Sequence, residues 1–317
     1  MINMNEMAKM CENRKKGILS REAYWSEFKE VLENLSEFVS FQAKKEINLS
    51  TESNEIFVDM KCTQSHQCRI KMLLDPYDIR SVPFSVLADG YYEPFQSDLL
   101  VTLGKVANRF LDIGSNMGFY SLALAKENPS LIVDAFEPQP GVFKTLTRNT
   151  QINNLSERIN LHNMGLGIKQ TELTMYVPKF TGSGGASFKN LHEDEGAATE
   201  VKVKVQTLDS LELKDIDLIK IDVEGFELNV IMGSSKLILD SKPTIMVELL
   251  RKWMKPFDHT PQMFLEKMFQ YDYKCFAIRQ NDLIEIDTVN ENTHETNFIF
   301  VHPEKILHIK EIINLID

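Results

Sequence analysis

The sequence predicts an α/β fold with a doubly wound, mostly parallel sheet, and three observations support this class. From about residue 108 onward, short apolar runs alternate with stretches of helical length and pattern. Two of the apolar runs end in an acidic residue, Asp112 and Glu137, and a glycine turn follows the first. Residues 1–90 lack this alternation, so they predict a separate, smaller unit.

Strands and helices alternate through the main part of the chain. The expected elements are strand 109–113, helix 118–126, strand 131–136, helix 141–151, strand 158–163, strand 217–222, helix 227–239 and strand 244–249. Such alternation places helices on both faces of a parallel sheet. An expected helix at 261–271 precedes three late strands with hairpin character, at 273–278, 283–287 and 297–301. A terminal helix is expected after them.

An insertion interrupts the alternation between residues 171 and 206. Two β-type runs, Glu172–Val177 and Val201–Val205, flank a polar, glycine-rich loop at 181–187. Because functional pockets are often shaped by loops on a rigid scaffold, we expect this loop and the N-terminal unit to form the substrate pocket.

The N-terminal unit is predicted to begin with a long amphipathic helix. Ser20 is a suitable N-cap, and apolar residues then recur at spacings of three and four from Tyr24 to Val39. This helix packs on its own domain or, alternatively, forms a homodimer contact.

Short strands follow the predicted helix. Strand-like runs occur at Glu55–Lys61 and Cys68–Leu74, and a further helix is expected near Phe95–Leu103. We therefore expect two domains, an N-terminal appendage at 1–90 and a main domain at 91–317.

Composition and charge exclude several classes of protein. The chain has 35 Lys and Arg against 46 Asp and Glu, a net charge of −11, so it has no excess of cations for broad contact with nucleic acid phosphates. No apolar run approaches the ~18 residues that a membrane span needs. The N-terminus also lacks the apolar core of a signal peptide, and a cytoplasmic location is therefore expected.

The four cysteines predict neither a disulfide framework nor a metal site. Cys11, Cys62, Cys68 and Cys275 show no secreted-type pattern, which is typical of a reducing compartment. Cys62 and Cys68 lie close to His66, but no fourth zinc ligand is evident and the spacing matches no common zinc finger. We interpret them as ordinary strand and turn residues.

The turn after the first strand predicts a nucleoside-bearing cofactor. In a doubly wound sheet, ligands bind beyond the carboxyl ends of the strands where the strand order reverses, and Gly114 and Gly118 fall there. Three residues separate these glycines, whereas a dinucleotide turn needs the spacing Gly-x-Gly-x-x-Gly. Asp112 suits a cofactor with a cationic amino-acid end, and Glu137 can accept hydrogen bonds from both hydroxyls of a ribose. These features favour S-adenosylmethionine over NAD.

The end of the third strand predicts the adenine contacts. By position, Asn163 could hydrogen-bond an adenine edge and Met164 could cover its face. A plain transition from strand to turn explains these residues equally well.

The fourth strand of the main domain carries the expected chemical site. Period-two alternation places Lys220 and Asp222 on one face, and Glu224 and Glu227 follow on the next turn. Asp222 or Glu224 could accept the proton of a hydroxyl during transfer. Alternatively, the carboxylates hold a divalent cation, which we favour less, or Lys220 and Asp222 form a structural ion pair.

These motifs together resemble the FkbM family of S-adenosylmethionine-dependent methyltransferases. The resemblance spans roughly residues 93–303. It rests on the motifs Phe-Leu-Asp-Ile-Gly-Ser-Asn-Met-Gly-Phe-Tyr-Ser at 110–121, Ala-Phe-Glu-Pro at 135–138, Thr-Leu-Asp at 207–209 and Leu-Ile-Lys-Ile-Asp-Val-Glu-Gly-Phe-Glu at 218–227. The last motif is the most specific.

The resemblance implies a Rossmann-like class I methyltransferase sheet, mostly parallel with an antiparallel late strand, and O-methylation of a sugar or another hydroxyl. It places Asp112, Gly114, Asn116 and Gly118 around the methionine moiety of the cofactor. It places Glu137 on the ribose, and Asp222 and Glu224 near the methyl group. Ser115, where the family often has alanine, Phe119 and Pro138 lie within the same motifs and are further candidates for cofactor binding.

The predicted function is therefore O-methyl transfer from S-adenosylmethionine to a hydroxyl of a sugar, a glycan or a small metabolite. Lys220, Asp222 and Glu224 are the candidate catalytic residues, and no metal is assigned. Two alternatives are an NAD-linked oxidoreductase and a non-catalytic scaffold that uses the helix at 20–39 for assembly. A fold with a cofactor site does not identify the acceptor.

Overall fold

The computed structural model describes residues 13, 16, 46–52, 55–75, 78, 81–178, 184–191, 198–279 and 282–306. The helix predicted at 20–39, with its dimer alternative, and the terminal helix predicted beyond residue 306 lie outside these ranges. Within the ranges, no helix combines the length and the apolar character that crossing a membrane requires.

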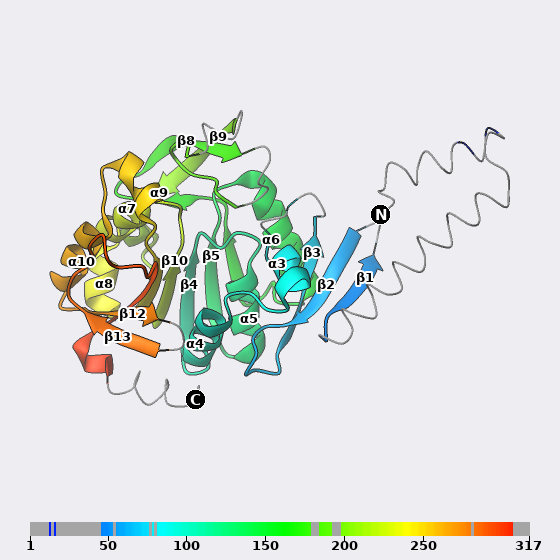
Figure 1. Cartoon of the computed structure of the whole chain (residues 1–317), viewed down its shortest axis with the longest axis horizontal. Coiled ribbons are helices and arrows are strands. Elements are labelled where there is room, and N and C mark those ends of the chain that lie inside the picture. The colour runs from blue at the N-terminus through cyan, green and yellow to red at the C-terminus, as the bar shows by residue number, and fades with distance from the viewer. Residues whose placement is uncertain are drawn as a thin grey trace.

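An eight-stranded sheet forms the centre of the molecule, in the order β13-β12-β14-β11-β10-β4-β5-β6 (Figure 1). Strands β11, β10, β4, β5 and β6 are parallel to one another, whereas β14 runs antiparallel to β11. The predicted mostly parallel sheet with an antiparallel late strand is therefore confirmed. The strands are β4 (Arg109–Ile113), β5 (Ile132–Phe136), β6 (Ile159–His162), β10 (Leu218–Ile221), β11 (Thr244–Glu248), β12 (Lys274–Arg279), β13 (Asp282–Ile286) and β14 (Asn297–Val301).

The strand order reverses beside β4. The chain proceeds outward through β5 and β6, then returns to place β10 on the other side of β4. The register sets Lys220 beside Asp112 and Ile221 beside Ile113, so the carboxyl ends of β4 and β10 coincide. Ligands of doubly wound sheets bind at such a reversal.

Helices cover both faces of the sheet, and each face has its own hydrophobic core. Phe110 and Val133 belong to the core shared with α4 (Pro94–Gly104), α5 (Phe119–Glu127) and α6 (Pro140–Ile152). Leu111 and Ile219 belong to the core shared with α7 (Glu227–Met232), α8 (Ser235–Ser241) and α10 (Pro261–Phe269). Successive side chains on these strands therefore enter opposite cores, as expected for strands buried on both faces.

A three-stranded antiparallel sheet, β1 (Asn48–Glu52), β2 (Glu55–Lys61) and β3 (Arg69–Leu74), lies beside α5 and α6 (Figure 1). Met60 and Met72 of this sheet join the same core as α4 and α5. Strands β2 and β3 match the sequence prediction. The prediction lacks β1, because this strand is polar and largely exposed. The division of the chain at residue 90 stays a prediction.

Two helices differ from the prediction. The helix expected at 227–239 is two helices, α7 and α8, which separate at Gly233. There the backbone approaches Gly167 so closely that a Cβ atom on Gly233 would lie 2.0 Å from the carbonyl oxygen of Gly167. Helix α3 (Val82–Asp89) is absent from the prediction, although Ser81 as N-cap and Pro83 in the first turn signal a helix start.

The hairpin between β2 and β3 pairs Cys62 with Cys68 in a disulfide, and their Cα atoms lie 5.7 Å apart. The cysteine pattern predicted no disulfide between Cys62 and Cys68, and this prediction is wrong. The antiparallel strands bring the two residues together, with the N–H of Cys62 donating to the carbonyl of Cys68. Between them, the ring of His66 hydrogen-bonds Glu127 at 3.2 Å and Thr102 at 3.0 Å.

A third, smaller sheet accounts for the insertion. It has the order β7-β9-β8, formed by β7 (Gly165–Leu166), β8 (Thr171–Pro178) and β9 (Ala198–Gln206). Residues 184–191 follow β8, and an isolated bridge between Ser187 and Tyr176 holds them against that strand.

Candidate active site

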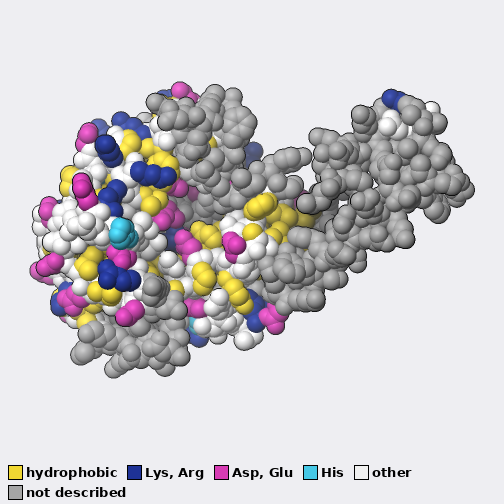
Figure 2. All heavy atoms as spheres, viewed as in Figure 1, with side chains coloured by type: hydrophobic (Ala, Val, Ile, Leu, Met, Phe, Trp, Pro, Cys, Tyr) yellow, Lys and Arg dark blue, Asp and Glu magenta, His cyan; other side chains and the backbone are white. Residues whose placement is uncertain are grey.

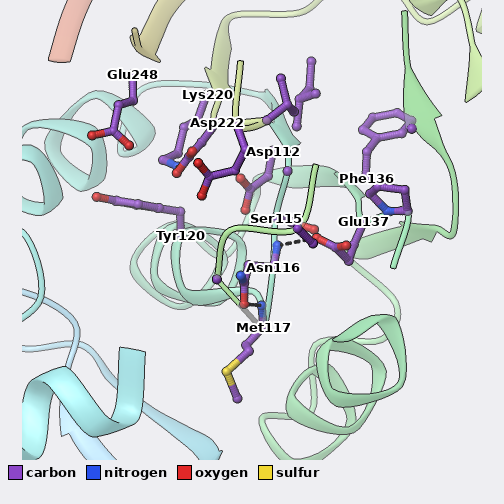
Figure 3. Close-up of a pocket in the computed structure, with 18 of the residues that line it drawn as sticks. Asp112, Ser115, Asn116, Met117, Tyr120, Phe136, Glu137, Lys220, Asp222 and Glu248 are labelled. Carbon is purple, nitrogen blue, oxygen red and sulfur yellow. Dashed lines mark hydrogen bonds and ion pairs between the residues drawn. The ribbon is translucent and has the colours of Figure 1, made fainter. Parts of the chain in front are cut away.

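A cavity of about 310 Å³ opens at the carboxyl ends of β4, β5, β10 and β11 (Figure 3). Most of the predicted site residues line it, namely Asp112, Gly114, Ser115, Asn116, Phe119, Glu137, Pro138, Met164, Lys220, Asp222 and Glu224. Gly184, Gly185 and Ala186 of the predicted loop line it as well. The reversal of strand order has therefore brought the two motif regions to one cavity.

The glycine turn has a geometry that only glycine tolerates at its first position. Gly114 has φ +81°, and a Cβ atom there would lie 1.8 Å from the carbonyl oxygen of Asp222. The ends of β4 and β10 therefore touch at backbone level. Gly118, with φ +90°, precedes the first residue of α5 and faces Leu146. Gly118 is not among the residues that line the cavity, and it shapes the turn that leads into α5.

Asp112, at the end of β4, anchors helix α5. Its Oδ2 atom accepts hydrogen bonds from the backbone N–H of Ser121 at 3.1 Å and from the Ser121 hydroxyl at 2.6 Å. Burial raises the pKa of Asp112, while Lys220 and the bonds from Ser121 lower it in part. A carboxylate at the first turn of a helix is electrostatically favourable.

Glu137, at the end of β5, is held by two backbone N–H groups. Its Oε2 atom accepts from Asn116 at 3.0 Å and its Oε1 atom accepts from Gln139 at 2.8 Å. Burial raises the pKa of Glu137 to about 7, and the two N–H groups offset part of that effect. Each oxygen keeps a further lone pair for a donor in the cavity.

Apolar side chains surround the end of the cavity beside Glu137. Phe136 and Met164 both line it, and His162 stacks on the far side of Phe136 with ring centroids 4.4 Å apart. Asn163 does not line the cavity. Its side-chain amide donates to the carbonyls of Glu137 at 2.8 Å and Pro138 at 3.2 Å, so it positions the acidic turn.

Lys220 and Asp222 lie at the opposite end of the cavity (Figure 3). The Lys220 ammonium contacts Asp222 Oδ2 at 2.9 Å and lies 4.9 Å from the centre of the Tyr120 ring. Burial alone would lower the pKa of Lys220, but Asp222, Glu93 and Asp112 outweigh it and raise that pKa. These carboxylates therefore stabilise the charged form of Lys220.

The turn after β10 carries Glu224 in a left-handed conformation, with φ +52°. Glu227 holds this turn, because its Oε1 atom accepts from the N–H groups of Gly225 at 2.9 Å and Val223 at 3.3 Å. Burial, Asp222 and Glu227 raise the pKa of Glu224 to about 8, while the N–H of Gly185 lowers it in part. Glu224 thereby links the turn to the loop at 184–187.

The structure adds carboxylates and aromatic rings that the sequence did not single out. Glu93, before α4, accepts a hydrogen bond from the Tyr120 hydroxyl, and Glu248 ends β11 at the cavity. Tyr92 forms a further wall of the cavity. Glu93, Glu248 and Tyr92 lie outside the quoted motifs, whereas Tyr120 belongs to the motif at 110–121. Glu248, like Glu137, is an acidic residue at the end of an apolar strand. This pattern in the sequence could have identified it as a site residue.

The charge of the cavity differs from that of its surroundings. Lys220 is the only Lys or Arg among the described residues that line the cavity. Outside it, Lys and Arg side chains gather over α9 (Arg251–Met254) (Figure 2). Lys252 lies 3.9 Å from the centre of the Trp253 ring. An acidic interior therefore lies beside a basic surface.

A sequence profile described as the methyltransferase FkbM domain matches residues 112–275, just over half of the chain. The matched range contains both strand-end acids and the Lys220–Asp222 pair.

Two curated relatives from fungi are methyltransferases by name. The chain is 29% identical over 193 residues to Methyltransferase 1 of Beauveria bassiana, a match that covers 54% of this chain and 74% of that protein. It is 29% identical over 157 residues to Methyltransferase sdnD of Sordaria araneosa, covering 40% and 61% respectively. A solved FkbM methyltransferase from Methylobacillus flagellatus KT is 18% identical, with a TM-score of 0.40 over 72% of this chain and 55% of that chain.

Proposed function

We propose that this chain, which belongs to the FkbM methyltransferase family, is an S-adenosylmethionine-dependent O-methyltransferase that acts on a hydroxyl of a sugar, a glycan or another small metabolite. One observation carries the proposal. Glu137, held by two backbone N–H groups, and the Lys220–Asp222 pair face a single cavity from opposite ends. This arrangement suits a molecule with a ribose at one end and a reactive, positively charged centre at the other.

The donor and acceptor groups of the cavity fit this cofactor. Glu137 would accept the ribose hydroxyls, and hydrogen bonds from them would favour its charged form. Phe136 and Met164 would cover the adenine. The Ser115 hydroxyl is buried, lines the cavity and has no hydrogen-bond partner among the described residues, so it offers a polar contact for the amino-acid end together with Asp112. Bound S-adenosylmethionine supplies a methyl group on a positively charged sulfur.

The residues of the chain then orient the acceptor and exclude water. Lys220 fixes the direction of the Asp222 carboxylate, and Asp222 lies where β10 ends at the cavity. Glu224 ties the loop at 184–187 to the same end through Gly185. Because alignment and removal of water supply much of the catalysis in group transfer, a modest set of reactive side chains is sufficient.

The acidic interior favours a neutral acceptor. Asp222, Glu224 and Glu248 line one end of the cavity, Glu93 lies close to Lys220 and Asp222 behind it, and Lys220 is the one cation among the described lining residues. These carboxylates would repel a negatively charged acceptor, and such repulsion contributes to specificity. A phosphorylated sugar would bring more negative charge to this end, so we expect a neutral hydroxyl group to be the acceptor.

Methyl transfer from isotope-labelled S-adenosylmethionine tests the proposal. The purified chain is incubated with a panel of neutral sugars, glycosides and phenols, each paired with its phosphate ester, and the products are identified by mass spectrometry. We expect label on the oxygen of neutral acceptors, reduced about 100-fold in Asp222→Asn through loss of alignment. Transfer to nitrogen or carbon, or a preference for the phosphate esters, would contradict the proposal.

A further inference from the structure

Glu248 ends β11 directly beside the reactive end of the cavity. Val247 pairs with Ile221 in the parallel register, so Glu248, the last residue of β11, and Asp222, the first residue after β10, lie at the same edge of the sheet. Figure 3 shows Glu248, Lys220 and Tyr120 around one end of the cavity, apart from Glu137. Glu248 therefore lies on the side where an acceptor would approach.

The other ionisable groups at this end are already engaged. Asp222 is paired with Lys220 at 2.9 Å, and Glu93 accepts the Tyr120 hydroxyl. Glu224 accepts the N–H of Gly185. The Glu248 carboxyl group, by contrast, accepts no hydrogen bond from any residue that the structure describes, and Glu248 lines the cavity. It has the most capacity to accept a proton from a bound molecule.

The charges that face Glu248 hold it in its neutral form while the cavity lacks a positive ligand. Burial is the main cause, and Asp222, Glu93 and Glu224 add to it, whereas Lys220 acts in the other direction; together they raise the pKa of Glu248 to about 8. The two tyrosines at this end are neutral, because burial and the carboxylates raise their pKa values well above the ordinary range. A cation entering the cavity would shift this balance and favour the carboxylate.

We propose that Glu248 is the catalytic base of this site and that it loses its proton when the positively charged cofactor enters the cavity. The inference rests on the proposed function. In the transfer step the acceptor oxygen bonds to the methyl carbon, the carbon–sulfur bond breaks with its electron pair remaining on sulfur, and the hydroxyl proton moves to Glu248. Sulfonium and carboxylate thus become a neutral thioether and a neutral carboxylic acid.

This coupling makes the base available only when the methyl donor is bound. It also leaves the products without a charge to hold them in the acidic cavity. Because buried charges are costly unless they are paired, the enzyme avoids both an unpaired carboxylate before binding and an unpaired sulfonium after it.

Calorimetry of S-adenosylmethionine binding in two buffers of different ionisation enthalpy measures the protons released. Near neutral pH, we expect Glu248→Gln to release fewer protons than wild type, by roughly half a proton. Glu157→Gln, at an exposed position, is the control and keeps that release, whereas Glu224→Gln tests the other cavity carboxylate whose pKa is raised to about 8. S-adenosylhomocysteine, which lacks the charge, should show little difference between wild type and Glu248→Gln.

Equal proton release by wild type and Glu248→Gln would overturn the proposal, as would a loss confined to Glu224→Gln. A complete lack of binding heat for S-adenosylmethionine in wild type would instead contradict the proposed function, so the two failures are distinguishable. Circular dichroism of each variant confirms that the fold is intact.

Discussion

Ser121 donates two hydrogen bonds to one carboxylate oxygen of Asp112, from its backbone N–H at 3.1 Å and from its hydroxyl at 2.6 Å. The strand-end acid of β4 is thereby bound to the first turn of α5. It supports the helix and, in the proposed function, also receives the charged end of the cofactor. Substitutions can separate these two roles.

Ser121→Ala removes the hydroxyl donor and keeps the N–H, so it should destabilise the protein by about 1 kcal/mol. Its affinity for S-adenosylmethionine should stay within a few fold of wild type. Asp112→Ala removes the carboxylate itself and should weaken binding by more than about tenfold, since a charged hydrogen bond is lost. Denaturant unfolding and calorimetry measure the two effects. Equal affinities in the two variants would show that Asp112 has only the structural role.

Gly114→Ala should damage both the fold and the site. The added Cβ atom would meet the Asp222 carbonyl at 1.8 Å, and φ is +81°. Gly90→Ala is the matched control, because Gly90 has φ +98° and no atom within 4 Å of the added Cβ. We expect the control to lose about 1–2 kcal/mol from the left-handed backbone alone. Gly114→Ala should lose clearly more in denaturant unfolding, and similar losses would argue against a close approach of β4 and β10.

Glu248→Gln should stabilise the free protein at high pH. The pKa of Glu248 is raised from 4.5 to about 8 on folding, so between these values the folded state binds more protons than the unfolded state. The contribution of Glu248 to the free energy of unfolding is fully present below 4.5, its pKa in the unfolded state. This contribution is lost as the pH rises toward 8. Glutamine does not titrate. The difference in melting temperature between variant and wild type should therefore grow as the pH rises through this window, and a constant difference would contradict it.

The cofactor half of the site was predictable because its residues form a local pattern. Asp112 and Glu137 follow apolar strands, and the two glycines at 114 and 118 have a spacing that excludes a dinucleotide turn. Eight of the ten residues predicted to bind the cofactor line the cavity. The remaining two, Gly118 and Asn163, shape the backbone around it.

The acceptor half was not predictable in the same way. Glu248 reaches the cavity only because β11 lies beside β10, and this neighbour relation is not visible in a local pattern. The Cys62–Cys68 pair likewise depends on the hairpin between β2 and β3. Residues joined by tertiary packing carry no short-range signal.

Binding of S-adenosylmethionine to wild type and to Glu137→Ala is the most direct test of the account. The substitution removes the acceptor of the Asn116 and Gln139 N–H groups together with the proposed ribose contact. We expect one binding site in wild type and an affinity reduced by more than about 100-fold in Glu137→Ala, since two charged hydrogen bonds are lost. Glu157→Ala, at an exposed position after α6, is the control and should bind as wild type does.

Titration calorimetry with S-adenosylmethionine, and with NADH as the competing ligand, gives the decisive result. The account predicts binding of S-adenosylmethionine alone, weakened by Glu137→Ala and unaffected by Glu157→Ala. Absence of binding to wild type, unchanged affinity in Glu137→Ala, or tighter binding of NADH would contradict it.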